Sequence, residues 1–311
     1  MYCSKISNNG NLITSTTAIL IVSLVLMVIF IVNSINYMEN QNIDSIASDS
    51  FKYTLDDYSR NIEVLARESI AEEAEKVYKP HIILDSRKDI KKILDKKLKS
   101  VNEEYKKNHG IDIRSEVLSV ENTDSPWKVL FKVRVKADKD TEAFDSVIER
   151  NCSIEGLKDP LPYNMLPLSS LLDDGETIYY TKYLTAYLLA NGVKSPESYF
   201  LATSPAVVKK CPYDPYTHHG DGDTLKNCLK NGYFHESADG SCYLCRLEGK
   251  AVCPHYGMEV FIQPHTPFTN DTVSCVDHVV FHDRYDGKKL NRIDPDSLIL
   301  DSSHKKKYGL N

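Results

Sequence analysis

The stretch Ala18-Ile-Leu-Ile-Val-Ser-Leu-Val-Leu-Met-Val-Ile-Phe-Ile-Val32 lies near the N-terminus, within a run from Leu12 to Val32 that carries no charge. A helix over this run is about 30 Å long, which matches the hydrocarbon core of a bilayer. A cleaved signal peptide has a shorter apolar run and a small-residue cleavage site, which the following residues 34–37 lack. The run therefore predicts a single transmembrane anchor. A cleaved signal and a buried core helix are the alternatives.

The charges on either side of this run predict its orientation. Lys5 precedes it, whereas Glu39, Asp44 and Asp49 follow it before the next positive charge at Lys52. Positive charge favours the cytoplasmic side of a membrane. We therefore expect a single-pass protein of the cell membrane, with membrane lipid as a partner, a cytoplasmic N-terminus and an extracellular C-terminal part.

The apolar pattern continues beyond the predicted anchor at alternating steps of four and three residues. No Pro or Gly interrupts it before Pro80. Such spacing indicates an amphipathic helix, so one long helix is expected to run on to about Val77. The apolar positions are Ile43, Ala47, Phe51, Leu55, Tyr58, Ile62, Leu65 and Ser69. They predict either a stalk or a helix that packs on a globular domain.

The next segments predict a helix followed by antiparallel strands. Asp85 or Ser86 is a suitable N-cap for a helix over residues 87–109, and Gly110 is a suitable end. Residues 127–135 alternate apolar and polar side chains, as a half-buried strand does, and residues 111–121 and 146–155 are further strand candidates. The predicted fold class is α+β, with the long N-terminal helix packed on an antiparallel sheet.

The second half of the chain is less periodic. Residues 157–172 are predicted as a loop and residues 176–190 as a short helix. After residue 195 the sequence becomes rich in Cys, His, Pro and Gly, with strands expected at 257–262, 272–282 and 297–300. The predicted regions are a tip and anchor (1–33), a helix-plus-sheet ectodomain (34–194) and a Cys-rich, loop-rich β region (195–311).

Composition excludes some classes of function. The 311 residues include 26% charged side chains and a net charge of −6 at pH 7, which is ordinary for a globular protein. A mildly acidic chain lacks the basic surface that phosphate backbones require, so nucleic acid is not an expected partner.

Cysteine is concentrated in the C-terminal region. Outside the cytoplasm such density predicts disulfides that stabilise a region with a small core. The disulfide candidates are Cys211, Cys228, Cys242, Cys245, Cys253 and Cys275. Cys3 precedes the anchor, and Cys152 is the candidate for an unpaired thiol because the seven cysteines beyond the anchor are an odd number.

A metal is the alternative use for part of this set. The spacing Cys242-x2-Cys245-x7-Cys253-x-His255 offers three thiolates and an imidazole, a possible tetrahedral zinc site. Cofactors are otherwise not expected. The Cys242-x-x-Cys245 pair lacks the strand-then-helix context of a thioredoxin-like redox motif.

A second polar cluster covers residues 218–223, with His235-Glu236 further on. These side chains could bind a divalent cation, but their order fits no calcium loop, and a polar surface turn is the simpler interpretation. Motifs for hydrolases, phosphate-binding loops and dinucleotide binding are missing from the sequence, so an enzyme is not expected. Two sequons, at Asn151 and Asn270, are candidate glycosylation sites.

The order of a membrane helix, an amphipathic helix and a sheet resembles the type IV pilin-like proteins. Residues 246–249, 257–262, 276–281, 293–294 and 308–310 are similar to segments of archaeal membrane-anchored surface proteins of that kind. The resemblance implies a structural or interaction role at the cell envelope, with other surface or pilus subunits as possible partners. It also implies possible cleavage after Gly10, although no acidic residue precedes Glu39, where such proteins often carry one.

Overall fold

The computed structural model describes residues 9–79, 82–190, 199–263, 275–281, 291–292, 299–300 and 302–310. Only the backbone is described for residues 9–19, 36–48, 275, 291–292, 299–300 and 302–303. The chain divides into two compact units, Met1–Tyr58 with Lys139–Glu142, and Ser59–Asp138 with Ala143–Asn311. The candidate sites described below all lie in the second unit.

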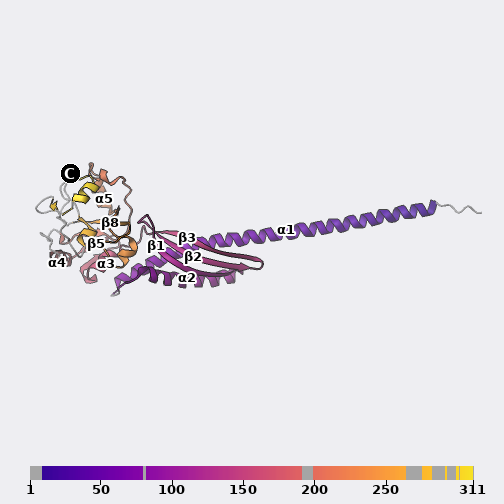
Figure 1. Ribbon diagram of the computed structural model, residues 1–311, viewed down its shortest axis with the longest axis horizontal. Helices are drawn as coiled ribbons and strands as arrows, with labels where there is room; N and C mark the ends of the chain where they lie inside the picture. Colours follow the sequence, from indigo (N-terminus) through magenta and orange to yellow (C-terminus); the bar gives the residue numbers. More distant parts are fainter. Residues whose placement is uncertain are drawn as a thin grey trace, which may run out of the picture. The chain divides into compact units, whose positions relative to one another are not determined.

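Helix α1 (Asn9–Ala74) is continuous, as the uninterrupted pattern predicts, and the short helix η1 (Glu75–Tyr78) follows it (Figure 1). In the first unit its side chains from Leu20 to Val32 are exposed. Among the residues described, the structure contains no helix with both the length and the apolar character needed to cross a membrane. The predicted anchor starts at Leu12, where side chains are not described, so it stays a prediction.

In the second unit, α1 buries one face. Ile62 and Ser69 are fully buried, as the apolar pattern predicts. Leu65, which the pattern also includes, is only half-buried, and the buried positions beside it are Ala66 and Ile70. The neighbouring Arg67 donates hydrogen bonds to the backbone carbonyls of Ser153 and Glu155, the latter at 2.6 Å. This end of α1 therefore packs on the globular part of the unit.

Helix α2 (Ser86–His109) confirms the prediction from its capping residues. Asp85 accepts a hydrogen bond from the backbone N–H of Lys88 at 3.0 Å, and Gly110 ends the helix in the left-handed conformation. The helix lies along strand β1 (Asp112–Asn122), where Asp95 accepts a 2.9 Å hydrogen bond from the N–H of Val117 (Figure 1).

The first sheet has the order β1-β2-β3, with β2 (Lys128–Lys139) between β1 and β3 (Glu142–Ser153). Strands β1 and β2 pair antiparallel, with Val117 opposite Val133 and an irregularity between Val117 and Ser119. Alternate side chains of β2 are buried, as its period of two predicts. Helix and antiparallel sheet together make the second unit an α+β fold.

The middle segments differ from their predictions. The expected loop contains α3 (Leu161–Met165) and η2 (Leu168–Ser170), and the expected helix at 176–190 begins only at α4 (Lys182–Ala190). Its first residues instead form β5 (Thr177–Tyr180), which pairs with β4 (Leu171–Asp173) and β6 (Thr203–Pro205). The predicted boundary near residue 195 lies outside the described residues.

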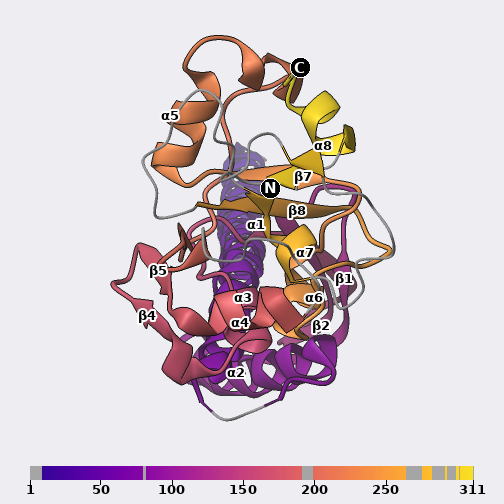
Figure 2. The ribbon, with the colours of Figure 1, turned by 90° about the vertical axis from the view of Figure 1, so that its left-hand side faces the viewer.

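The C-terminal region is built from short elements around a sheet of order β7-β8-β9 (Figure 2). Strand β8 confirms its prediction. The elements are η4 (Tyr216–Gly220), α5 (Thr224–Asn231), β7 (Phe234–Ser237), α6 (Tyr243–Leu247), β8 (Gly257–Ile262), β9 (Cys275–Val276), α7 (Asp277–Val280), β10 (Asn291–Arg292), β11 (Ile299–Leu300) and α8 (Ser302–Lys307). Strands β10 and β11 pair antiparallel, and β11 lies within the predicted strand 297–300.

The predicted strand 272–282 is wrong in its described part. Only β9 is extended, and the chain then turns into α7. The reason is local, because the carboxylate of Asp277 accepts a 2.8 Å hydrogen bond from the N–H of His278 and so favours a helical turn at this point.

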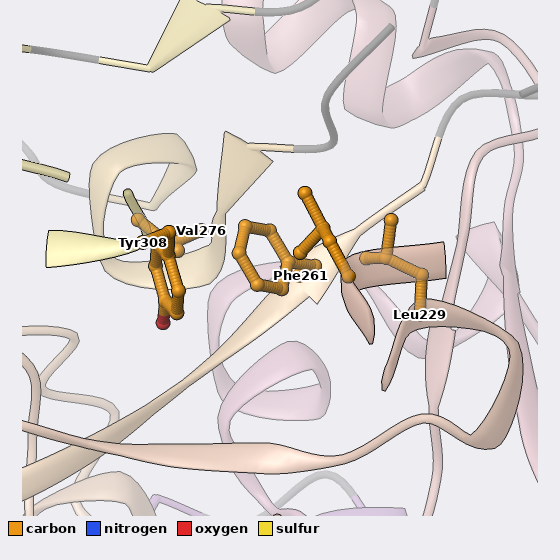
Figure 3. Packing of buried hydrophobic residues seen from close by; sticks show 5 residues of the cluster. Leu229, Phe261, Val276 and Tyr308 are labelled. Carbon is orange, nitrogen blue, oxygen red and sulfur yellow. The ribbon is translucent and has the colours of Figure 1, made fainter. Parts of the chain in front are cut away.

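Apolar packing joins the last elements to the rest of this region. Figure 3 shows part of a cluster that consists of Leu225, Leu229, Phe261, Val276 and Tyr308. Two glycines allow the close approach behind Tyr308. A Cβ on Gly309 would lie 1.8 Å from the carbonyl oxygen of Thr217, and a Cβ on Gly220 would lie 2.2 Å from that of Gly309. The segment after α8 is therefore held against η4.

Polar contacts connect the C-terminal region with the rest of the second unit. The indole N–H of Trp127 donates to Glu236 at 2.7 Å, and the hydroxyl of Ser86 donates to Glu248 at 2.8 Å. Deeper inside, the guanidinium of Arg246 is fully buried and pairs with the buried carboxylates of Asp159 and Asp277.

Candidate metal centres

Two sets of four Cys and His side chains come together between residues 211 and 255. In each set one ligand atom per residue lies within 4.8 Å of the others. We call them the Cys211 site, formed by Cys211, His219, Cys228 and His235, and the Cys242 site, formed by Cys242, Cys245, Cys253 and His255.

Three elements and one loop supply the Cys211 site. Cys211 follows β6, and its N–H donates to the carbonyl of Phe234 in β7 at 2.9 Å, which fixes it beside that strand. His219 lies in η4, Cys228 in α5 and His235 in β7. Gly232 ends α5 with φ 65°, a left-handed conformation that turns the chain directly into β7.

The distances in the Cys211 site are those of a small tetrahedron. The two sulfur atoms are 3.5 Å apart, and Sγ of Cys211 is 3.5 Å from Nε2 of His219. Nε2 of His235 lies 2.9 Å from Sγ of Cys228 and 3.1 Å from Nε2 of His219. A zinc ion with bonds of about 2.0–2.3 Å gives ligand-to-ligand edges of about 3.3–3.8 Å. The two 3.5 Å distances fall in this range, and the two distances from Nε2 of His235 are a few tenths of an ångström shorter, so a small outward shift of this ring would fit a zinc ion.

The surroundings orient the two imidazoles. Nδ1 of His219 lies 2.9 Å from the carbonyl oxygen of Tyr216, a contact that places the proton on Nδ1 and leaves Nε2 as the electron-pair donor. The ring of Tyr308 packs edge-on against both His219 and His235, at centroid distances of 5.5 and 5.1 Å. All four side chains of the site are buried. The site is therefore closed to solvent. The carbonyl of Tyr216 orients the ring of His219, whereas Nδ1 of His235 has no hydrogen-bond partner among the described residues.

The Cys242 site brings together the four residues that the sequence spacing singles out. Cys242 caps α6, Cys245 lies in its first turn, and the N–H of Cys242 donates to Sγ of Cys253 at 3.3 Å. Nδ1 of His255 lies 3.6 Å from Sγ of Cys242 and 3.5 Å from Sγ of Cys245. His255 is only half-buried, so this site reaches the surface on its imidazole side.

The thiols in these sites share protons. In the Cys211 site, the hydrogen bond from Cys228 lowers the pKa of Cys211 to about 3 and raises the pKa of Cys228. In the Cys242 site, hydrogen bonds from the other two thiols hold the pKa of Cys253 well below its usual value. Burial lowers the pKa of His235, which favours the neutral imidazole. The lowered pKa of Cys211 and that of Cys253 favour the thiolate form, and binding of a divalent cation would release the remaining thiol protons.

The cysteines differ from the predicted disulfide pattern. Cys211, Cys228, Cys242, Cys245 and Cys253 are all free thiols, and they face imidazoles and one another within the two sites. The sequence pattern suggested bridges because disulfide frameworks and thiolate metal sites use the same residue density. The side chains of Cys275 and Cys3, and those around the sequon at Asn270, lie outside the described residues.

Three further candidates stand apart from these sites. Cys152 is a buried free thiol on β3, 3.5 Å from the carbonyl of Glu63, and burial raises its pKa to about 12. Asn151 is exposed, as a glycan acceptor requires. His218 is exposed and lies 3.5 Å from Asp221, so this part of the polar cluster is a surface turn as expected.

Sequence reasoning missed the Cys211 site as a unit. It treated the cysteines as disulfide candidates and His219 and His235 as parts of a polar loop. The signal was the order Cys211, His219, Cys228, His235, which alternates thiol and imidazole at gaps of seven to nine residues.

Comparison of this chain with protein-family models, with curated proteins and with solved structures found no match.

Proposed function

We propose that this chain is a structural zinc-binding protein, in which two zinc ions, one at the Cys211 site and one at the Cys242 site, hold the C-terminal region in shape. The single observation that carries the proposal is the pair of four-ligand Cys/His sets, each with its ligand atoms within 4.8 Å of one another. Sites with four protein ligands leave no open position for substrate, and they stabilise folds rather than catalyse reactions.

The donor chemistry favours zinc over other cations. The two sites offer five sulfur and three nitrogen ligands, as Cys2His2 and Cys3His sets. Thiolate and imidazole in a tetrahedral arrangement are the ligands of structural zinc, whereas calcium and magnesium take oxygen ligands. The clustering of thiols around neutral or hydrogen-bonded imidazoles supports the same assignment.

The need for zinc follows from the size of the elements. In the region from Cys211 to His255 the longest described element is α5, which has eight residues. Such short pieces bury little apolar surface, and metal ligation is a common substitute for a core. The Cys211 site then fixes η4, α5 and β7 relative to one another, and the Cys242 site fixes α6 to the segment that precedes β8. The contacts of Trp127 and Ser86 attach this region to α2 and the first sheet.

Metal analysis of the full chain tests the proposal. We expect two zinc ions per chain that resist a weak chelator and are released when a mercurial reagent modifies the thiols. Cys228→Ser should remove one ion and Cys245→Ser the other, whereas the buried but isolated Cys152→Ser should keep both. X-ray absorption of the zinc protein should give an average of five sulfur to three nitrogen ligands per two ions.

Two results would overturn the proposal. One is a protein without thiol-dependent zinc after refolding in the presence of zinc. The other is peptide mapping that finds Cys211 or Cys242 in a disulfide in the native chain. Because the X-ray absorption measurement uses the unmodified protein, a variant that fails to fold does not weaken the test.

The single-pass anchor, the extracellular position of the C-terminal region and the pilin-like surface role remain proposals from the sequence. In that scheme the zinc-stabilised region is the part that contacts other surface subunits. Sequencing of the mature N-terminus checks it: a start at Asn11 supports pilin-type processing, and a start at Met1 supports an uncleaved signal anchor.

A further inference from the structure

A third group of potential ligands lies beside the first two but contains no thiol. Asp239 follows β7, His278 lies in α7 and His304 in α8, and one ligand atom from each lies within 4.8 Å of the others. The three residues span 66 positions of sequence. Their convergence depends on the packing of α7 and α8 near the β7-β8 pair.

The state of His278 points to a ligand. Its side chain is only 4% exposed, yet neither ring nitrogen has a hydrogen-bond partner among the described residues. A neutral imidazole always carries one donor and one acceptor, and leaving both unmet in a buried position costs free energy. A cation, or a water bound to a cation, would therefore supply the partner that the ring nitrogens of His278 lack.

A buried carboxylate lies beside both imidazoles. The carboxylate of Glu259 in β8 is fully buried, with Oε2 3.6 Å from Nδ1 of His278 and 3.2 Å from Nε2 of His304. The other oxygen of Glu259 accepts a 2.9 Å hydrogen bond from Lys307 and a short one from the hydroxyl of Tyr308. The carboxylate is thereby fixed, and it orients the ring of His304 as carboxylates next to metal ligands commonly do.

We propose that Asp239, His278 and His304 form a third metal site, which binds one first-row divalent cation and leaves at least one coordination position open. Two imidazoles and one carboxylate suit zinc, iron(II), cobalt(II) and manganese(II), and three protein ligands leave room for water or a small anion. Asp239 is partly exposed whereas both imidazoles are buried, so we expect the open position on the side of Asp239. The site does not depend on zinc at the two thiolate sites.

Cobalt(II) is the probe that separates the three sites. The full chain is first loaded with zinc, its weakly bound metal is removed with a mild chelator, and cobalt(II) is then titrated. We expect one cobalt ion per chain, with the weak visible bands of nitrogen and oxygen ligation and without the near-ultraviolet bands of thiolate ligation. Addition of azide should shift these visible bands, because the anion can enter the open position.

The variants decide the assignment. Asp239→Asn and His278→Gln should each weaken cobalt binding at least tenfold while the two thiol-dependent zinc ions stay bound. His218→Gln, which changes an exposed imidazole 3.5 Å from Asp221, is the matched control and should bind cobalt as the unmodified chain does. Asp239 is at the partly exposed edge, so its variant keeps the test valid if His278→Gln fails to fold.

Each outcome has one meaning. Absence of a thiol-free cobalt site in the unmodified chain, or undiminished binding in both variants, overturns the third site and leaves the zinc proposal standing. Cobalt binding by an unmodified chain that takes up no thiol-dependent zinc overturns the zinc proposal and leaves the third site standing. Cobalt binding without any response to azide overturns the open position.

Discussion

The buried ion cluster around Arg246 allows a quantitative prediction. Nε of Arg246 donates to Asp159 at 2.7 Å, and Nη2 contacts Asp159 at 2.5 Å and Asp277 at 2.6 Å. The side chains of all three residues are at most 2% exposed. Arg246→Met keeps most of the aliphatic bulk but leaves two carboxylates in the interior without their positive partner.

We expect a large loss of stability from this change. Removal of one partner from a buried ion pair costs about 3–5 kcal/mol, because the remaining charge keeps its desolvation penalty. Two carboxylates lose their partner here, so the upper part of that range is expected. Typical domains have a free energy of unfolding of about 5–15 kcal/mol, so the variant should still fold but with a clearly lower urea midpoint.

Urea unfolding followed by tryptophan fluorescence measures this effect. Trp127 is the only tryptophan of the chain, and it is buried against Glu236 in the same unit as Arg246. Arg134→Met is the matched control, since Arg134 pairs with Asp145 through the same two-point geometry, at 3.0 Å each, but on the exposed surface. The control should move the midpoint far less. Equal shifts for Arg246→Met and Arg134→Met would refute the reasoning from burial.

Three more changes have defined outcomes. Burial alone would raise the pKa of Glu248, but hydrogen bonds from Lys250 and Ser86 lower it below its usual value. Because the pKa of Glu248 is lower in the folded chain than in the unfolded chain, its ionised carboxylate stabilises the fold above about pH 5. This stabilisation is lost as the pH falls through the pKa of the folded chain. Glu248→Gln should therefore cost about 1–3 kcal/mol at pH 7 and progressively less below pH 4 in urea unfolding. Gly257→Ala places a methyl group 2.5 Å from the backbone carbonyl carbon of Ser241. The variant should therefore show lower zinc occupancy at the Cys242 site in the mercurial-release assay. Unchanged occupancy would show that the backbone moves to accommodate the methyl group. Asp85→Ala removes the N-cap of α2 and should cost about 1 kcal/mol, and no change in the urea midpoint would mean that solvent replaces this cap.

The sequence predicted correctly those helices and strands that are determined by capping residues or by apolar alternation within the segment itself. The cap at Asp85 and the stop at Gly110 define α2, and the alternation in β2 defines its buried face. The helix expected over 176–190 begins six residues late, because Thr177–Tyr180 pairs with β4 and β6. This strand forms because it has a neighbouring strand on each side, and the sequence of residues 177–180 alone does not show that these neighbours exist.

The two thiolate sites also differ in how far the sequence alone could predict them. The Cys242 site has all its ligands within fourteen residues, so its spacing alone suggested a zinc set. The Cys211 site draws its ligands from three elements and a loop, and His219 was indistinguishable in the sequence from the exposed His218 next to it. Only the fold separates the two neighbouring histidines, because η4 turns one inward and leaves the other at the surface.

The close contact between Gly220 and Gly309 holds the segment that supplies Lys307 and Tyr308 to the buried carboxylate of Glu259. Residues 211–255 contain all the ligands of both thiolate sites, whereas Lys307 and Tyr308 lie about fifty residues further along the sequence. A chain that stops before Ser302 would contain both thiolate sites, yet it would bury Glu259 without the partners that Lys307 and Tyr308 supply. Loss of α8 and Tyr308 should therefore destabilise the region around β8, because the buried carboxylate of Glu259 would keep its desolvation penalty without these partners.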